Sequence, residues 1–204
     1  MSRVLTSTAL HDAVWAAMPA DARPERFVPR RAFLLSGVAS GETVLDVGCG
    51  AGEFSAVLAE AGATPIAVDV AHEALRRARE RVPGLDARLW ARGEPLPLPD
   101  DAVDVVWAGE VIEHVADVAP WLSELRRVLR PQGTLLLTTP NHGRATLLGL
   151  ALSPRRFDAH FEPRCDHVRF FSTRTLRALL GDLGFDVTRL RVRHGTILAT
   201  AGRA

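Results

Sequence analysis

Two groups of residues in this chain have the types and spacing of a chemical site. The first is a run of glycines at Gly48, Gly50 and Gly52, which follows an apolar stretch and precedes a helix-forming one. Glycines let a ligand approach the backbone closely, and a helix N-terminus offers unpaired N–H groups. A second short apolar run ends in Asp69, and an acidic residue there can accept hydrogen bonds from both ribose hydroxyls. These features predict a nucleoside-cofactor site.

The second group is Glu110-x-x-Glu113-His114, which follows another apolar run. On a helical turn, residues three and four apart share a face, so we expect these three side chains to point the same way. Two carboxylates and an imidazole suit a divalent cation such as Mg²⁺, Mn²⁺, Co²⁺ or Zn²⁺. Without a metal, His114 has the chemistry of a general base.

The glycine spacing helps to choose between nucleoside cofactors. Dinucleotide-binding folds use Gly-x-Gly-x-x-Gly, with the third glycine over a helix N-terminus that holds a pyrophosphate. Here the third position is Glu53, whose carboxylate is expected to repel a diphosphate. The spacing therefore favours a cofactor with a ribose and no phosphate, and disfavours a nicotinamide dehydrogenase.

The segment VLDVGCGAG, followed by AVDV, resembles the first two motifs of the class I S-adenosylmethionine-dependent methyltransferases. The resemblance continues through LPLPDDAVDVVWAGEVIEHV and LRRVLRPQGTLLLTTPN to HVRFFSTRTLRALLGDLGFDV, roughly residues 42–190. It implies that S-adenosyl-L-methionine is the cofactor, with Asp69 on the ribose and Val70 against the adenine. The cofactor-binding residues implied in this way are Asp46, Gly48, Cys49, Gly50, Gly52, Asp69, Val70, Glu94 and Glu110.

The adenine side departs from the family pattern. Relatives usually carry Gly-Asp-Ala-Glu, whose Asp receives the adenine amino group, where this chain has Ala91-Arg92-Gly93-Glu94. Arginine cannot accept that hydrogen bond. We expect Glu94, a backbone carbonyl, or packing and main chain alone to take its place.

The Glu-x-x-Glu-His pattern resembles the metal motif of small-RNA 3′-end 2′-O-methyltransferases and of ubiquinone-biosynthesis O-methyltransferases. The RNA enzymes add a ligand from an Asp-His pair, and His167 stands at the corresponding place here. The resemblance thus implies a metal quartet of Glu110, Glu113, His114 and His167, with His114 and His167 as catalytic residues. In the alternative without metal, Glu110 contacts the cofactor amine, His114 orders the helix start, and His167 and Arg169 tie a loop to the sheet.

The elements that position these residues alternate between strands and helices. This alternation predicts an α/β fold, a Rossmann-like doubly wound seven-stranded sheet whose last strand is antiparallel because a hairpin at His194-Gly195 precedes it. Helices are expected at residues 9–18, 29–38 and from 118, with Asp117 as cap, and at 174–183, capped by Ser172 or Thr173. The expected strands cover residues 44–48, 65–69, 86–90, 103–108, 133–139, 185–193 and 196–201.

We expect a single methyltransferase domain over residues 1–204, with residues 1–40 as an N-terminal helical cap and residues 140–171 as a substrate roof. Ligands of open α/β sheets bind beyond the carboxyl ends of the strands, where both segments can cover the site. The alternative is that residues 1–40 only cover core. In the roof, His142 and His160 are candidate substrate contacts, and a group of arginines either favours an anionic acceptor or is simply solvated: Arg144, Arg155, Arg156 and Arg164.

Composition sets the remaining expectations. The chain has 204 residues, a net charge of +1 and two cysteines, which suggest free thiols in a reducing cytoplasm. We predict a cytoplasmic protein with no membrane partner; oligomeric state stays open.

The leading function is O-methylation of a small hydroxylated molecule (a catechol, sugar or quinone precursor), because the Asn/Asp-Pro-Pro-aromatic element of many amine methyltransferases is missing. Alternatives are an RNA 3′-end 2′-O-methyltransferase, disfavoured by the lack of a continuous basic track, and a non-catalytic S-adenosylmethionine-binding regulatory protein.

Overall fold

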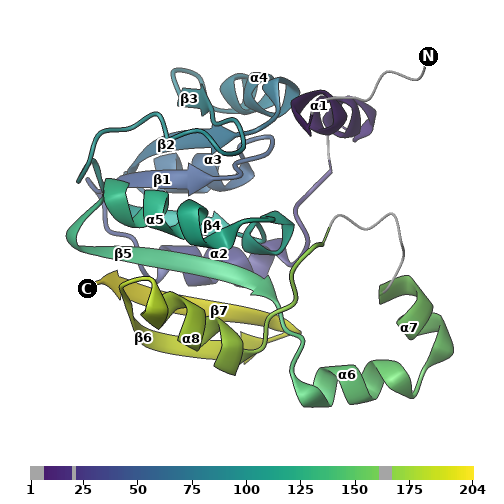
Figure 1. Ribbon diagram of the computed structural model, residues 1–204. Helices are drawn as coiled ribbons and strands as arrows, with labels where there is room; N and C mark the ends of the chain where they lie inside the picture. The colour runs from purple at the N-terminus through teal and green to yellow at the C-terminus, as the bar shows by residue number, and fades with distance from the viewer. Residues whose placement is uncertain (1–6, 20–21, 161–166) are drawn as a thin grey trace.

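The computed structural model describes residues 7–19, 22–160 and 167–204 and contains one seven-stranded sheet (Figure 1). The strand order is β3-β2-β1-β4-β5-β7-β6, and β7 runs antiparallel to both of its neighbours while the other pairs are parallel. The Rossmann-like fold with an antiparallel last strand is therefore confirmed. The strands are β1 Thr43–Val47, β2 Thr64–Asp69, β3 Asp86–Leu89, β4 Val103–Gly109, β5 Leu129–Pro140, β6 Phe185–Arg193 and β7 Thr196–Arg203.

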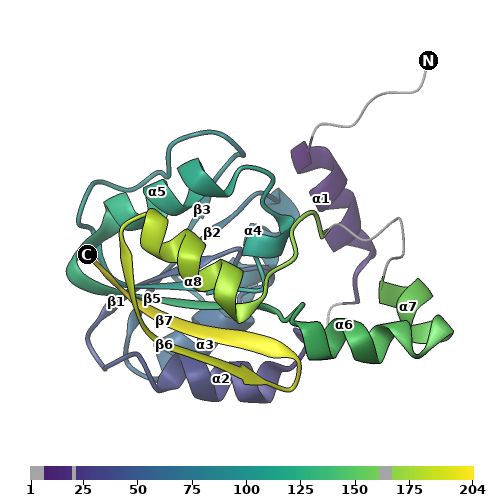
Figure 2. The same cartoon turned by 60° about the horizontal axis from the view of Figure 1, so that its bottom comes forward.

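Both faces of the sheet are covered by helices (Figures 1 and 2). Leu122 and Leu125 of α5 (Val118–Val128) and Leu176 of α8 (Thr173–Asp182) belong to the largest apolar cluster, on one face. On the other face, Leu34 of α2 (Phe27–Leu35) packs in one cluster with Phe54 of α3 (Glu53–Glu60). A further helix, α4 (His72–Arg81), contributes to a third cluster beside β2 and β3. The central strands read as continuous apolar runs because they are buried on both sides.

Several element boundaries and caps differ from the sequence predictions. Helix α2 ends at Leu35, before the predicted residue 38, and β5 begins at Leu129 directly after α5. Ser172 caps α8 in a reciprocal box with Thr175, so the choice between Ser172 and Thr173 is settled. Asp117 occupies the N-cap position of α5, but its side chain accepts no capping hydrogen bond among the described residues. A cap prediction from residue type therefore succeeds only where the side chain turns back onto the helix.

Two segments lie outside the covered sheet (Figure 1). Helix α1 (Ser7–Ala17) lies beside α4, and α6 (Arg144–Ala151) and α7 (Pro154–His160) extend from the end toward which β5 points. No side chain of α6 is buried, so α6 projects from the body instead of closing over it. None of the described helices has the length and apolar character needed to cross a bilayer.

Candidate active site

The glycine loop joins β1 to α3 at the carboxyl edge of the sheet. Gly48, Gly50 and Gly52 all have positive φ angles, of 64°, 54° and 80°, which only glycine adopts readily. A Cβ atom on Gly48 would come within 2.6 Å of Val111, and one on Gly50 within 2.7 Å of Trp15. These glycines therefore make room for side chains of the protein itself, a requirement that sequence reasoning had assigned to the ligand alone.

Asp69 ties the end of β2 to this loop. One carboxylate oxygen accepts the Gly50 N–H and the other accepts the Ala71 N–H, both at 3.0 Å. Burial raises the pKa of Asp69, and the backbone N–H groups partly offset that rise. Each oxygen keeps a second lone pair, so a ribose hydroxyl can still bind. Asp69 and the half-buried Val70 stand at the end of β2, and their contacts with the cofactor stay a prediction.

Asp46 lies beneath the loop and is almost fully buried. Ser55 donates a hydrogen bond of 2.6 Å to its carboxylate. Burial raises the pKa of Asp46 to about 7, while the Ser55 hydroxyl works in the opposite direction. The residue supports the loop from inside the protein. Cys49, also predicted at the cofactor, is a buried free thiol whose pKa is raised by burial.

Glu53 does not carry an uncompensated negative charge. Its carboxylate forms an ion pair of 2.7 Å with Arg81 of α4, and Arg81 also donates to the Ala51 carbonyl. The expected repulsion of a diphosphate is therefore weaker than the sequence suggested, because a partner 28 residues away neutralises the charge. The glycine spacing remains the better argument against a dinucleotide.

The loop after β3 carries the residues that the sequence predicts at the adenine. Arg92 is exposed and its guanidinium lies 3.3 Å from the ring of His11 on α1. The Glu94 carboxylate is exposed as well, whereas its carbonyl accepts a hydrogen bond of 2.8 Å from the Trp90 indole. His11 is half-buried in this contact, whereas His72 and His194 are exposed.

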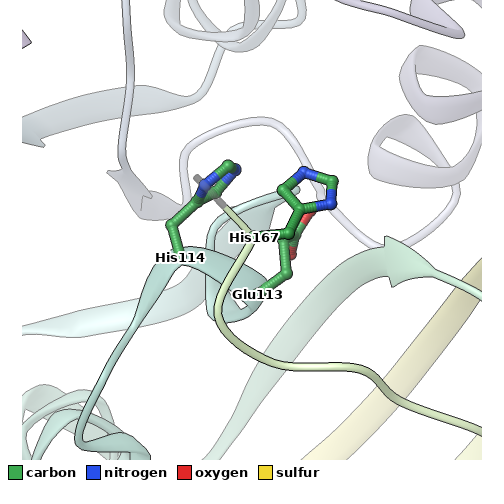
Figure 3. Close-up of side chains that lie close together, drawn as sticks. All are labelled: Glu113, His114 and His167. Atoms are coloured by element: carbon green, nitrogen blue, oxygen red, sulfur yellow. The ribbon is translucent and has the colours of Figure 1, made fainter. Parts of the chain in front are cut away.

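The turn after β4 and the segment that carries His167 bring together a compact group of ligand-type side chains. Glu113, His114 and His167 converge, with ligand atoms within 4.8 Å of one another (Figure 3). The two imidazole rings meet edge to face at 4.7 Å between centroids. Thr139 donates a hydrogen bond of 3.0 Å to the Glu113 carboxylate, and the backbone N–H groups of Val168 and Arg169 donate to its carbonyl. The segment that carries His167 is therefore anchored on the turn that carries His114.

Glu110 does not join this group, which corrects the predicted metal quartet. The helical turn begins only at Ile112, and Glu110 precedes it with a left-handed backbone, at φ 56°. The i, i+3 and i, i+4 geometry on which the prediction relied therefore does not apply to Glu110. Burial raises the pKa of the Glu110 carboxyl, and the nearby charge of Arg30 opposes the rise.

Arg30 is a buried residue at the site that sequence reasoning missed. It is 4% exposed, and its guanidinium carbon lies 4.7 Å from the centroid of the Phe54 ring. A Cβ atom on Gly109 would approach its guanidinium to 2.5 Å, so Arg30 fills the space beside the end of β4. One feature of the sequence could have indicated Arg30: it stands four residues before Leu34, on the buried face of an apolar helix.

Glu113 has a more strongly perturbed carboxyl than the neighbouring Glu110. Burial, reinforced by the charge of Glu110, raises the pKa of Glu113 to about 7. Its Oε1 atom is buried and finds no hydrogen-bond partner among the described residues. A carboxylate oxygen in that state fits a cation or a hydroxyl donor.

The roof segment brings His142 next to a cavity. His142 is 8% exposed and meets Phe170 edge to face at 4.9 Å. The cavity measures about 330 Å³ and is lined by His142, Leu147, Phe170, Ser172 and Thr175. Arg144 and Arg155 are exposed, whereas Arg164, Cys165 and Asp166, together with the side chains of Arg156 and His160, lie outside the described part of the chain.

Comparison with known proteins identifies relatives over most of the chain. A model of a methyltransferase domain matches residues 19–190. A probable S-adenosylmethionine-dependent methyltransferase of Mycolicibacterium smegmatis is 38% identical over 78% of this chain. A malonyl-[acyl-carrier protein] O-methyltransferase of Methylococcus capsulatus is 36% identical, and a ubiquinone biosynthesis O-methyltransferase of Azorhizobium caulinodans 32% identical, each over 74% of the chain. The chain spans 58%, 54% and 61% of the lengths of these three relatives, respectively.

A solved structure agrees with the fold. The S-adenosylmethionine-dependent methyltransferase of Aquifex aeolicus superposes with a TM-score of 0.66 and 25% identity. The match covers 89% of this chain and 94% of the other.

Proposed function

The chain belongs to the class I S-adenosylmethionine-dependent methyltransferases, and we propose that it transfers the cofactor's methyl group to an oxygen atom of a small acceptor molecule. The cofactor is S-adenosyl-L-methionine. Two relatives are named as O-methyltransferases, which supports oxygen as the acceptor atom. The sequence also lacks the Asn/Asp-Pro-Pro-aromatic element of many amine methyltransferases.

The observation that carries this proposal is the group of Glu113, His114 and His167 after β4. A hydroxyl is a weak nucleophile until its proton is removed, and this group offers two imidazoles and a carboxylate for that purpose. The sulfonium methyl is already activated. Alignment of the acceptor oxygen with it then supplies the larger part of the rate, roughly 7–11 kcal/mol of barrier for well-oriented groups.

The same three side chains fit a divalent cation. The buried Glu113 Oε1 without a hydrogen-bond partner among the described residues is the observation that supports this fit. A cation held by Glu113, His114 and His167 would lower the pKa of an acceptor hydroxyl. In its absence His114 takes the proton, with His167 beside it, and a general base is typically worth about 10²–10⁴-fold in rate.

We assign two buried groups beside the end of β4 to the methionine end of the cofactor. Glu110 Oε1 and Arg30 Nε are both buried and without hydrogen-bond partners among the described residues. A carboxylate suits the methionine ammonium group, and a guanidinium suits its carboxylate. This assignment leaves Glu110 to the cofactor and removes it from the metal ligands.

The deciding experiment measures methyl transfer from labelled S-adenosylmethionine to a panel of catechols, sugars and quinone precursors. Each reaction is run with and without EDTA and after addition of Mg²⁺, Mn²⁺, Co²⁺ or Zn²⁺. If a metal is used, EDTA abolishes transfer and one cation restores it. If His114 is instead a general base, EDTA has no effect and His114→Ala lowers kcat by about 10²–10⁴-fold.

His72→Ala is the matched control, because His72 is exposed on α4 and is not part of the group. Full activity of both His114→Ala and Glu113→Gln would contradict the proposed role of the group. Transfer only to amine acceptors in an extended panel would contradict O-methylation itself.

A further inference from the structure

We infer that α1 forms the outer wall of the cofactor site and that Trp15 is a positioning residue for S-adenosylmethionine. The inference rests on the cofactor alone and holds for any acceptor. Trp15 is half-buried, and two atoms of its indole lie 2.7 Å and 2.9 Å from the position that a Cβ atom on Gly50 would occupy. The indole therefore contacts the middle glycine of the cofactor loop directly.

Helix α1 is attached to the helix that follows the ribose-binding strand. The Asp12 carboxylate accepts the Glu73 N–H at 3.0 Å, so a residue of α1 caps the first turn of α4. At the other end, Arg77 donates a hydrogen bond of 3.0 Å to the Met18 carbonyl. The partners of the first bond are 61 residues apart in sequence and those of the second are 59 apart. Together the two bonds hold α1 along α4.

The third attachment reaches the adenine loop. His11 lies 3.3 Å from the Arg92 guanidinium, and it is also close enough to Asp69 to act against the rise in that carboxyl's pKa that burial causes. One face of α1 thus extends from Gly50, past the ribose carboxylate, to the loop after β3. Arg92 stands where relatives have an acidic residue that contacts adenine. In this chain Arg92 instead links the loop after β3 to His11 of α1.

These contacts place an aromatic wall directly beside the glycine loop against which the cofactor is expected to lie. An indole restricts the positions open to the methionine and ribose parts, because it is rigid and occupies the space above Gly50. It also offers a π face to a cation, and the cofactor is a sulfonium. Removal of the indole should weaken cofactor binding without changing the glycine loop or Asp69.

The test measures binding of S-adenosylhomocysteine by calorimetry, which needs no acceptor. Trp15→Ala should raise Kd about tenfold, the loss expected for one aromatic contact, whereas Trp15→Phe should restore most of the affinity. Val14→Ala is the control, since Val14 is 52% exposed on the same helix. Wild-type affinity of Trp15→Ala would overturn the inference, and so would equal losses in the alanine and phenylalanine variants.

A fluorescence measurement keeps the inference testable if Trp15→Ala folds poorly. S-adenosylhomocysteine should protect part of the wild-type tryptophan emission from acrylamide, and this protection should vanish in Trp15→Phe. Protection that persists in Trp15→Phe would assign the change to another tryptophan and overturn the inference.

A second experiment compares His11→Ala, Arg92→Ala and the double variant. The effects of the two substitutions on Kd should be less than additive, because either one breaks the same contact. Fully additive effects would show that the contact between Arg92 and His11 does not contribute to cofactor binding.

Discussion

At the scale of the residue, Asp46 links pH to the stability of the glycine loop. The Asp46 carboxyl is fully enclosed, and burial raises its pKa to about 7. In the unfolded chain an aspartate has a pKa of about 3.9. The native state therefore holds the proton more tightly, and the free energy of unfolding falls as pH rises from about 4 to about 7.

We predict that Asp46→Asn has a smaller loss of thermal stability over this pH range than the wild type. Asparagine keeps an oxygen that can accept the Ser55 hydroxyl hydrogen bond, and it has no charge to bury. The difference has an upper limit of about 4 kcal/mol, since one pKa unit is about 1.4 kcal/mol. Calorimetric melting curves at several pH values measure it. Parallel pH profiles for the two proteins would show that Asp46 does not titrate as described.

At the scale of the element, the sequence predicts a cap of α8 at Ser172 or Thr173, and the structure shows a capping box between Ser172 and Thr175. Ser172 accepts the Thr175 N–H at 3.2 Å, and Thr175 accepts the Ser172 N–H at 2.9 Å. We predict that Ser172→Ala lowers the free energy of unfolding by about 1 kcal/mol. Ser172→Asp, which retains a capping oxygen, should stay within about 0.5 kcal/mol of wild type. Urea unfolding distinguishes these outcomes, and equal losses would show that the cap is not the cause.

The projecting α6 allows a separate test of the roof segment. Leu148 is 63% exposed and Leu152, which follows α6, is 78% exposed. We predict that Leu148→Ser and Leu152→Ser change stability by less than about 0.5 kcal/mol. If the roof contacts the acceptor, the same variants raise KM for the acceptor found in the panel.

Leu122→Ala is the comparison for this test, because Leu122 is fully buried on α5 and its truncation should cost about 2–5 kcal/mol. An unchanged acceptor KM in both the Leu148 and the Leu152 variant would argue against a substrate role for the roof. A large stability loss in them would indicate that α6 packs against the body.

At the scale of the whole molecule, the arginines of β6 bear on the RNA alternative. Arg189, Arg191 and Arg193 are exposed at alternate positions of this edge strand. With α2 they line a groove of about 400 Å³ whose floor includes Phe33 and Leu198. Charged side chains commonly protect an edge strand from pairing with other chains, which accounts for them without nucleic acid.

We predict that replacing all three arginines by glutamine leaves methyl transfer to a small acceptor unchanged. For an RNA 3′-end enzyme that used this groove, the variant would bind short RNA more weakly. The magnitude of the slope of log K against log salt concentration would fall by about 2, because each of the three lost phosphate contacts contributes about 0.7 for a single strand. Filter binding at several salt concentrations measures both quantities. A loss of transfer to the small acceptor in the variant would contradict the interpretation that these arginines only protect the edge strand.

The sequence by itself determined the fold and the strand ends at which the candidate site residues stand. Alternating apolar runs, the glycine turn and the residues that end each strand follow from local periodicity and turn chemistry, which depend on near neighbours. For that reason all the expected strands are found, and Asp69 and Glu113 lie at the carboxyl edge as predicted.

Only the tertiary structure decided which side chains meet at that edge. Arg81 neutralises Glu53, Arg30 fills the space beside β4, and Trp15 covers Gly50. Glu110 leaves the predicted quartet because its backbone is left-handed, which its residue type does not indicate. Such contacts join residues far apart in the chain, and no pattern of neighbouring residues encodes the distance between them.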